Sequence, residues 1–139
     1  MSAAGTFRAR ILASDRVFYE GACESIIIPL PDGLYGIMAN HSNMIGAIVP
    51  GIIKYKTPEQ PYKIAAVSSG IVKVENNEVL VLADSIERPE EIDENRAKRS
   101  ADKAKEEISQ NRSIREYRLA QAHLARAVNR LKVKRTYGQ

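Results

Sequence analysis

Several charged side chains in the C-terminal part of the chain have the types and spacings of a polyphosphate-binding site. Arg126 and Arg130 stand four residues apart, so in a helix they share a face and present two guanidinium forks. Asp93 and Arg96 stand about one helical turn apart, where a carboxylate can accept hydrogen bonds from free N–H groups or from a ligand. If two helices close on each other, the arginines and Lys103 can line one cleft and bind a polyphosphate. The alternative interpretation is that the arginines form only a solvated helix face.

The other reactive side chains do not form a catalytic or metal-binding pattern. His41 stands in a polar loop sequence and is expected to be a hydrogen-bonded loop residue. His123 has Leu119 and Ala127 four residues away on either side, so no metal partner shares its helix face. The single cysteine, Cys23, has no neighbouring base or cation and is expected to be a packing residue. Because a Gly-rich phosphate loop of the Walker type is also missing, we expect neither an enzyme nor a required cofactor.

Basic charge is concentrated at the C-terminal end of the chain. Residues 1–86 contain 7 Lys or Arg against 8 Asp or Glu, whereas residues 87–139 contain 14 against 9. Within this tail, residues 87–111 carry 6 basic and 8 acidic groups, and residues 112–139 carry 8 basic groups and only Glu116. The net acidic half of the tail can therefore complement the net basic half in charge.

The first 86 residues have the pattern of an all-β domain. Short runs rich in β-branched and aromatic residues alternate with Gly, Pro, Asn and Asp. Asn76-Asn77 lies between two apolar runs and is typical of a two-residue hairpin turn with positive φ. Many short strands with frequent turns predict a sandwich or a barrel. The expected strands are residues 7–13, 17–20, 24–30, 35–38, 45–49, 52–56, 63–68, 71–74 and 79–83.

After Pro89 the pattern changes to that of two helices. The remaining sequence has no further Pro, no Gly until Gly138, and much Ala, Glu, Lys, Arg and Leu. Pro89 suits a first helical position, so the first helix is expected to start near it. The polar residues 109–113 predict a reversal. The chain is therefore expected to be an α+β protein, with an N-terminal antiparallel β-sandwich in residues 1–86 and a C-terminal antiparallel two-helix hairpin in residues 87–139.

The predicted inner faces of the two helices consist mostly of alanine. A methyl side chain buries little apolar area, and each buried CH₂ contributes only about 0.8 kcal/mol. We therefore expect a weakly packed hairpin that a ligand can hold closed or a partner can open. The residues that recur at helical spacing are Ala97, Ala101, Ala104 and Ile108 in the first helix, and Tyr117, Ala120, Leu124, Ala127 and Leu131, with Val128 beside them, in the second.

The sequence does not have the features of a membrane or secreted protein. No stretch reaches the roughly 18 consecutive apolar residues that a membrane-spanning helix needs. Residues 1–6 have neither the charged nor the apolar region of a signal peptide. A cytoplasmic location is expected.

Five segments, taken in their order along the chain, resemble the ε subunits of bacterial F-type ATP synthases. Their order across a β-rich half and an Ala-rich hairpin makes the combination specific. The segments are Tyr19-Glu20-Gly21, residues 33–41, residues 67–74, Leu82-Ala83-Asp84 and residues 125–131.

The resemblance implies a β-sandwich followed by two helices, in a non-catalytic subunit of the rotor stalk. Members of this family bind the γ subunit and the membrane-embedded c-ring, and they couple proton flow to ATP synthesis. In the extended state the hairpin reaches toward acidic segments of the α and β subunits and inhibits ATP hydrolysis. In the folded state it lies against the sandwich. The implied location is peripheral, on the cytoplasmic face of the cell membrane.

The resemblance also implies a regulatory ATP site on the folded hairpin. ATP-binding relatives have the pattern Ile-Asp-x-x-Arg-Ala, which stands here at residues 92–97. Lys103 replaces an arginine of those relatives and so loses bidentate geometry. In the segment that resembles the c-ring contact, Leu34 replaces an acidic residue and Ala39-Asn40 replaces Pro-Gly. The implied ATP ligands are Glu87, Ile92, Asp93, Arg96, Ala97, Lys103, Arg126 and Arg130.

A nucleic-acid-binding protein is the alternative from another functional class. The sequence pI near 9.3 and the basic run at residues 132–135 suggest it. However, the β-rich half is net acidic, and the basic helix lacks interleaved aromatic residues or a recognisable docking motif. No nucleic-acid partner is therefore expected.

Overall fold

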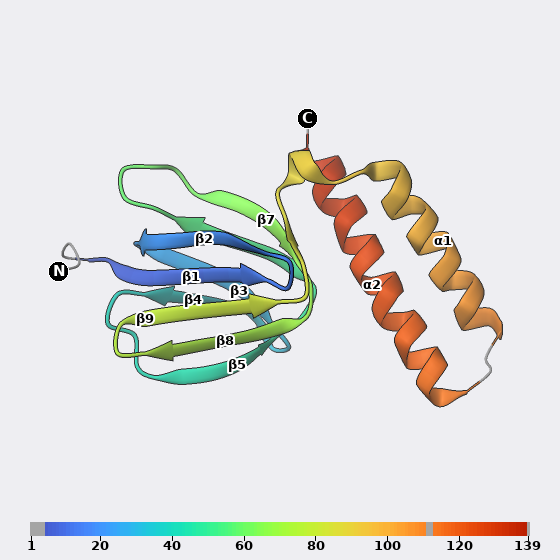
Figure 1. The fold of residues 1–139 in the computed structure, drawn as a ribbon, viewed down its shortest axis with the longest axis horizontal. Helices are drawn as coiled ribbons and strands as arrows, with labels where there is room; N and C mark the ends of the chain where they lie inside the picture. The colour runs from blue at the N-terminus through green and yellow to red at the C-terminus, as the bar shows by residue number, and fades with distance from the viewer. Residues whose placement is uncertain (1–4, 111–112, 139) are drawn as a thin grey trace. The chain divides into compact units, whose positions relative to one another are not determined.

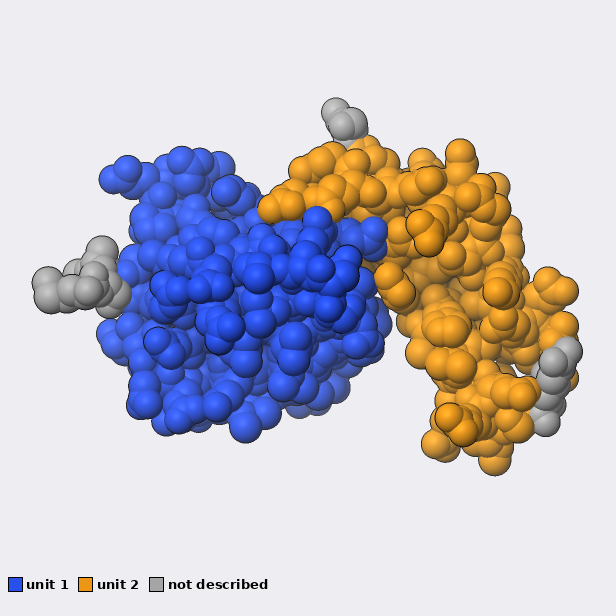
Figure 2. All heavy atoms as spheres, viewed as in Figure 1, with its two compact units in different colours: residues 1–87 blue, residues 88–139 orange. Residues whose placement is uncertain are grey.

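The computed structural model describes residues 5–110 and 113–138, which belong to two compact units. The first unit is Met1–Glu87 and the second is Arg88–Gln139, coloured separately in Figure 2. Strands build the first unit, and two helices with a short 3₁₀ turn build the second (Figure 1). The predicted α+β fold, a β-sandwich followed by a helical hairpin, is confirmed.

The sandwich unit contains two five-stranded sheets within the described residues. Sheet A has the order β2-β1-β9-β8-β5, and sheet B has the order β10-β7-β6-β3-β4. The strands are β1 (Phe7–Ala13), β2 (Arg16–Cys23), β3 (Ser25–Leu30), β4 (Gly33–Met38), β5 (Met44–Ile48), β6 (Gly51–Lys56), β7 (Lys63–Val67), β8 (Gly70–Glu75), β9 (Glu78–Ala83) and β10 (Ile86–Glu87).

All nine expected strands are present, with ends that differ by no more than a few residues. Strand β10 was not predicted, because two residues carry no periodicity. The described strands pair in the antiparallel sense except for β1 and β9, which run parallel from Arg8↔Glu78 to Ala13↔Ala83. This pair joins segments about 70 residues apart in the chain, so no local sequence pattern predicts it.

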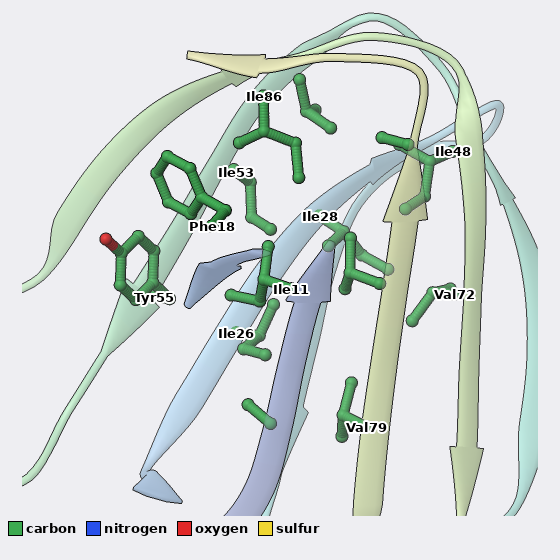
Figure 3. Close-up of a cluster of buried hydrophobic side chains, with 14 of the residues drawn as sticks. Ile11, Phe18, Ile26, Ile28, Ile48, Ile53, Tyr55, Val72, Val79 and Ile86 are labelled. Atoms are coloured by element: carbon green, nitrogen blue, oxygen red, sulfur yellow. The ribbon is translucent and has the colours of Figure 1, made fainter. Parts of the chain in front are cut away.

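The core lies between the two sheets and follows from the alternation of side chains along each strand. In β1, Phe7, Ala9 and Ile11 are buried, while Arg8 and Arg10 between them are exposed. Figure 3 shows isoleucines, valines and aromatic rings from both sheets converging in this cluster. All of the buried residues in the cluster lie between residues 7 and 86. The sandwich therefore has a core of its own.

Two local predictions in the sandwich are also confirmed. Asn76 and Asn77 have φ angles of 51° and 60° and connect β8 to β9 where Glu75 pairs with Glu78. Cys23 is fully buried, and this burial raises the pKa of its thiol to about 11, although the charge of Lys63 acts in the opposite direction. It is a packing residue, as expected.

The helical unit begins differently from the prediction. Residues Pro89–Glu91 form a 3₁₀ helix (η1), and helix α1 (Glu94–Gln110) begins five residues after Pro89 rather than at it. The reason is Ile92, whose backbone is extended (φ −78°, ψ 125°) and whose side chain is buried. Helix α2 (Ile114–Tyr137) follows. The expected reversal includes residues 111 and 112, which lie outside the described residues.

The contact between α1 and α2 consists largely of alanine, as the sequence predicts. Leu124 and Leu131 are only half-buried, and Tyr117 and Val128 are exposed by 36% and 47%. Among the described residues of the helical unit, Ile92 and Val133 are the large hydrophobic side chains that are buried, whereas the sandwich buries many. The buried alanines are Ala97, Ala101 and Ala104 in α1, and Ala120 and Ala127 in α2.

The substitution Gly70→Ala should destabilise the sandwich by about 1–3 kcal/mol. An added Cβ at this position would meet the Leu82 carbonyl oxygen and lie 2.7 Å from the Ala83 Cα, and both belong to the neighbouring strand. Urea unfolding followed by circular dichroism measures the loss. Gly36→Ala is the matched control, because nothing lies within 4 Å of a Cβ at Gly36 in β4. An equal loss in both variants would contradict the steric explanation.

Candidate functional site

Asp93 is the residue that positions the start of α1. Its Oδ1 accepts a hydrogen bond from the backbone N–H of Arg96 at 3.0 Å, which is the geometry of a helix N-cap. This hydrogen bond, together with the positive charges of Arg99 and Arg96, lowers the pKa of Asp93 below its ordinary value of 3.8. Arg96 is thereby held in the first turn of α1, with its side chain exposed. The predicted use of Asp93 as an acceptor for free N–H groups is confirmed.

Two of the expected ligand residues are buried within the helical unit. Ile92 is 2% exposed and Ala97 is 0% exposed. Pro89 is also buried, and η1, to which it belongs, contacts α2. Ile92 and Ala97 therefore shape the base of the hairpin. Sequence reasoning missed the buried Val133 of α2, which lies outside the predicted stripe.

Helical spacing groups the predicted cationic ligands within each helix. Leu119, Arg126 and Arg130 are spaced by seven and four residues, so they share a face of α2. Leu119 lines a cavity together with Lys103, which places Lys103 on the same side. Arg96 stands seven residues before Lys103 and so shares its face of α1. The cavity is lined by Lys103 but not by Arg96, Arg126 or Arg130, so the convergence of these four cations in one cleft stays a prediction.

Carboxylates also line this cavity, a feature that sequence reasoning missed. The cavity has a volume of about 340 Å³ and lies between the ends of α1 and α2 that adjoin the reversal. Three glutamates and a single lysine line the cavity, so the electrostatic potential around Lys103 is partly negative. An antiparallel register would have placed these glutamates near each other. The lining residues are Lys103, Glu106, Glu107, Gln110, Glu116 and Leu119.

Polar contacts organise both ends of the helices. At one end, Arg135 Nε donates a hydrogen bond to Glu94 Oε1 at 2.8 Å, which joins the last turn of α2 to the first turn of α1. At the other end, Ser113 Oγ accepts from the Glu116 N–H at 3.1 Å and caps α2. Glu87, the remaining predicted ligand, belongs to the sandwich unit, where it pairs with Ala66 as the last residue of β10.

A continuous row of apolar side chains crosses the outer face of sheet A. The strand registers place Ala47 opposite Ile71, Ile71 opposite Leu82, Leu82 opposite Leu12, and Leu12 opposite Val17. We call these five residues the apolar row. Val17, Ile71 and Leu82 are exposed by 59%, 45% and 41%. An apolar stripe that spans a whole sheet face is a typical protein contact surface.

The loop between β4 and β5 holds the first of the two histidines. His41 Nδ1 bonds to the Ser42 carbonyl oxygen at 2.7 Å, and because a carbonyl can only accept, Nδ1 carries the proton. His41 Nε2 therefore accepts from the Tyr35 hydroxyl at 2.7 Å, with the two rings edge to face. His41 is a hydrogen-bonded loop residue, as expected. Asn40 has φ 62°, a left-handed conformation that Asn tolerates better than most residues other than Gly.

Two family models match the chain, and together they cover residues 6–135. The ATP synthase delta/epsilon chain beta-sandwich domain matches residues 6–89, and the ATP synthase delta/epsilon chain long alpha-helix domain matches residues 90–135. The chain belongs to the ATP synthase delta/epsilon chain family. This confirms the resemblance found in the sequence, and with it the expected function as an epsilon-type, non-catalytic chain of an ATP synthase.

Curated relatives support the epsilon branch of the family over most of their length. The ATP synthase epsilon chain of Ruminococcus albus is 38% identical over 128 residues, which are 91% of this chain and 95% of that protein. The ATP synthase epsilon chain of Clostridium novyi is 36% identical, over 94% of this chain and 98% of that protein. That of Caldanaerobacter subterraneus subsp. tengcongensis is 37% identical, over 95% of this chain and 96% of that protein.

Solved structures share the fold at lower sequence identity. A chain of the mitochondrial ATP synthase of Euglena gracilis has a TM-score of 0.75 at 17% identity, and the match covers 93% of this chain and 81% of that chain. A chain of the Tetrahymena thermophila mitochondrial ATP synthase central stalk and c-ring has a TM-score of 0.63 at 11% identity, with 91% and 95% covered. Within residues 5–110 and 113–138, no helix combines the length and apolarity needed to cross a membrane.

The N-cap geometry predicts that Asp93 makes the start of α1 sensitive to acid. Because the folded-state pKa is below the ordinary value of 3.8, the folded state favours the ionised carboxylate. The stabilisation is therefore complete above that value and is lost as the pH falls through the lowered pKa. Hydrogen exchange of the first α1 amides, measured between about pH 2 and 6, should reveal this loss.

Asp93→Asn should abolish the acid-sensitive part of this protection while keeping the helix capped, because an amide oxygen also accepts the Arg96 N–H. Asp93→Ala should lower protection at every pH. If Asp93→Asn retained the full pH dependence of the unchanged chain, another carboxyl group would be responsible.

Proposed function

We propose that this chain joins a γ subunit and a c-ring in the rotor stalk of an ATP synthase through its sandwich, and regulates ATP hydrolysis through its hairpin. The proposal places it peripherally on the cytoplasmic face of the cell membrane, held there by the complex. The observation that carries the proposal is the apolar row on sheet A. Membership of the delta/epsilon chain family supports the choice of partners.

The apolar row is suited to a protein partner rather than to a small ligand. Its five residues form a shallow stripe whose ends are fixed by the edge strands β2 and β5. The neighbouring row of the same face runs through Glu20, Arg10, Leu80, Lys73 and Ile45, so charged groups alternate with apolar ones beside the apolar row. An apolar centre with a charged rim is the usual composition of a stable interface. In the proposed function this interface binds γ.

The c-ring contact is assigned to β4 and the loop that follows it. Leu34 and Met38 are exposed by 71% and 65% on the same face of this edge strand. Strand β4 contains no charged residue, and Leu34 stands where family members have an acidic side chain. The contact in this chain is therefore apolar at Leu34, with the hydrogen-bonded His41 beside it in the loop.

The hairpin supplies the regulatory part of the proposal. Its alanine contacts hold α1 and α2 together weakly, so a partner can compete for the α2 surface at moderate cost. Helix α2 carries seven Lys or Arg residues and one Glu, which suits binding to acidic segments of the α and β subunits. In the extended state this binding inhibits ATP hydrolysis.

ATP is proposed as the ligand that favours the folded state. In this proposal Arg96, Arg126 and Arg130 converge on one side of the hairpin and bind the phosphates, and Asp93 holds Arg96 in place. The glutamates around Lys103 oppose the approach of a triphosphate. A lysine also cannot form the two parallel hydrogen bonds that an arginine forms with a phosphate. Both features predict weaker ATP binding than in relatives that have arginine at this position.

Leu82→Lys should weaken the binding of γ at least about tenfold, because a charged group would then be desolvated at the centre of the apolar row. Surface plasmon resonance with purified γ measures the change. Leu34→Lys is the matched control, since Leu34 is more exposed but lies on sheet B. A chain that ends at Glu87 keeps the whole sandwich core and should still copurify with γ. Loss of γ binding by that folded sandwich would refute the docking role.

Lys103→Arg should tighten ATP binding about fivefold, because a guanidinium can form two parallel hydrogen bonds with a phosphate. Isothermal titration calorimetry on the full chain measures the affinity. Lys98→Arg makes the same change at another exposed position of α1 that is outside the predicted site and should have no effect. Absence of heat at millimolar ATP in every variant would exclude ATP sensing and leave the rotor role intact.

A further inference from the structure

Three separate segments meet at the end of the sandwich where β1 begins. They are the residues just before β1, the 39–43 loop between β4 and β5, and the Asn76-Asn77 turn between β8 and β9. Figure 1 shows all three at the same end of the strands. Asparagine side chains link them. The hydrogen bonds are Asn40 N–H to Asn77 Oδ1 at 2.6 Å, Asn77 Nδ2–H to the Thr6 carbonyl at 3.1 Å, and Asn76 N–H to Asn43 Oδ1 at 3.1 Å.

Asn77 occupies the centre of this network. Its carboxamide accepts from the 39–43 loop through one atom and donates to the segment before β1 through the other. The donor bond fixes the orientation of the amide, because Thr6 is 4% exposed and its carbonyl can only accept. The oxygen of Asn77 is therefore aimed at the backbone N–H of Asn40. An aspartate here would keep the acceptor and lose the donor.

These hydrogen bonds tie the 39–43 loop to the turn between β8 and β9, while Ala39 packs against the sandwich core. The loop's other hydrogen bonds are local: the His41 N–H donates to the Met38 carbonyl at 3.3 Å, and the His41 ring contacts Tyr35 and Ser42. Among the hydrogen bonds described for residues 39–43, those with Asn76 and Asn77 alone reach a different strand pair. Asn40 is also in the left-handed region, which a free loop would seldom keep.

We propose that Asn77 is a positioning residue that fixes the conformation of the 39–43 loop and so makes its docking surface rigid. This inference rests on the proposed function, in which that loop and β4 contact the c-ring. A loop that is ordered before binding does not lose conformational entropy on contact, and it transmits force without first being reordered. The side chain acts through the Asn40 backbone and does not itself touch the partner.

The turn offers a pair of substitutions that separate this role from general stability. Asn76 and Asn77 both have positive φ, which Gly adopts without strain, so Asn76→Gly and Asn77→Gly should both keep the turn. Asn76 bonds to Asn43 through its backbone N–H, which Gly retains. Asn77 bonds to Asn40 through its side chain, which Gly lacks. Asn76→Gly is therefore a matched control at the adjacent residue.

The first measurement is hydrogen exchange on the full-length chain without partners. Asn77→Gly should speed exchange of the Asn40 amide by about fivefold, as expected for the loss of one hydrogen bond. Asn76→Gly should leave it unchanged, and both variants should keep a cooperative thermal unfolding transition. Asn77→Asp, which keeps Oδ1, should preserve the Asn40 protection. Unchanged exchange in Asn77→Gly, or equal acceleration in Asn76→Gly, would overturn the inference.

The second measurement is ATP-driven proton pumping per ATP hydrolysed, in the assembled enzyme carrying each variant. Asn77→Gly should lower this ratio, whereas Asn76→Gly should not. A faster Asn40 exchange with unchanged pumping would support the positioning role and overturn the assignment of the loop to the c-ring. Failure of the inference and failure of the proposed function are thus distinguishable.

Discussion

The alternation of side chains in sheet A is the constraint on which most of the molecule depends. Phe7, Ala9 and Ile11 of β1 can reach the core only in one register with β9, and that register also decides what the outer face carries. A slip by one residue would bury Arg8 and Arg10 and expose the core. The same register aligns Leu12 with Leu82. The apolar row and the interior are therefore specified together, and neither can shift without the other.

The helical unit is organised by a different principle. Its buried side chains are mostly alanines, with Ile92 and Val133 as larger ones, and polar groups order the helix ends: Asp93 and Ser113 as caps, and the Glu94–Arg135 pair at the base. Each of these contributes modestly and is open to solvent, so the unit can change partners without disrupting a large core. A sandwich with a deep core and a hairpin with a small one fit the proposed division of roles, in which the sandwich binds a partner and the hairpin moves.

The sequence was sufficient for the features that are encoded locally. Strand positions, the positive-φ turn at Asn76-Asn77, the alanine faces and the capping role of Asp93 all follow from short patterns. The start of α1 was predicted too early. Ile92 is extended and its side chain is buried, and burial is a tertiary effect that a short sequence pattern does not show. Features that join distant segments were missed for the same reason. The parallel β1–β9 pair and the bonds of Asn77 each require knowledge of which segments become neighbours, whereas the glutamates around Lys103 could have been found from the predicted antiparallel hairpin.

The buried Cys23 makes this chain convenient for site-specific labelling. Burial raises the pKa of the thiol to about 11, so the reactive thiolate is scarce at neutral pH, and the sulfur is shielded from reagents. A cysteine introduced at an exposed position of α2 would therefore react with a maleimide dye far ahead of the native one. Fluorophores can be attached to α2 without first removing Cys23, and slow modification of Cys23 itself would report how often the sandwich opens.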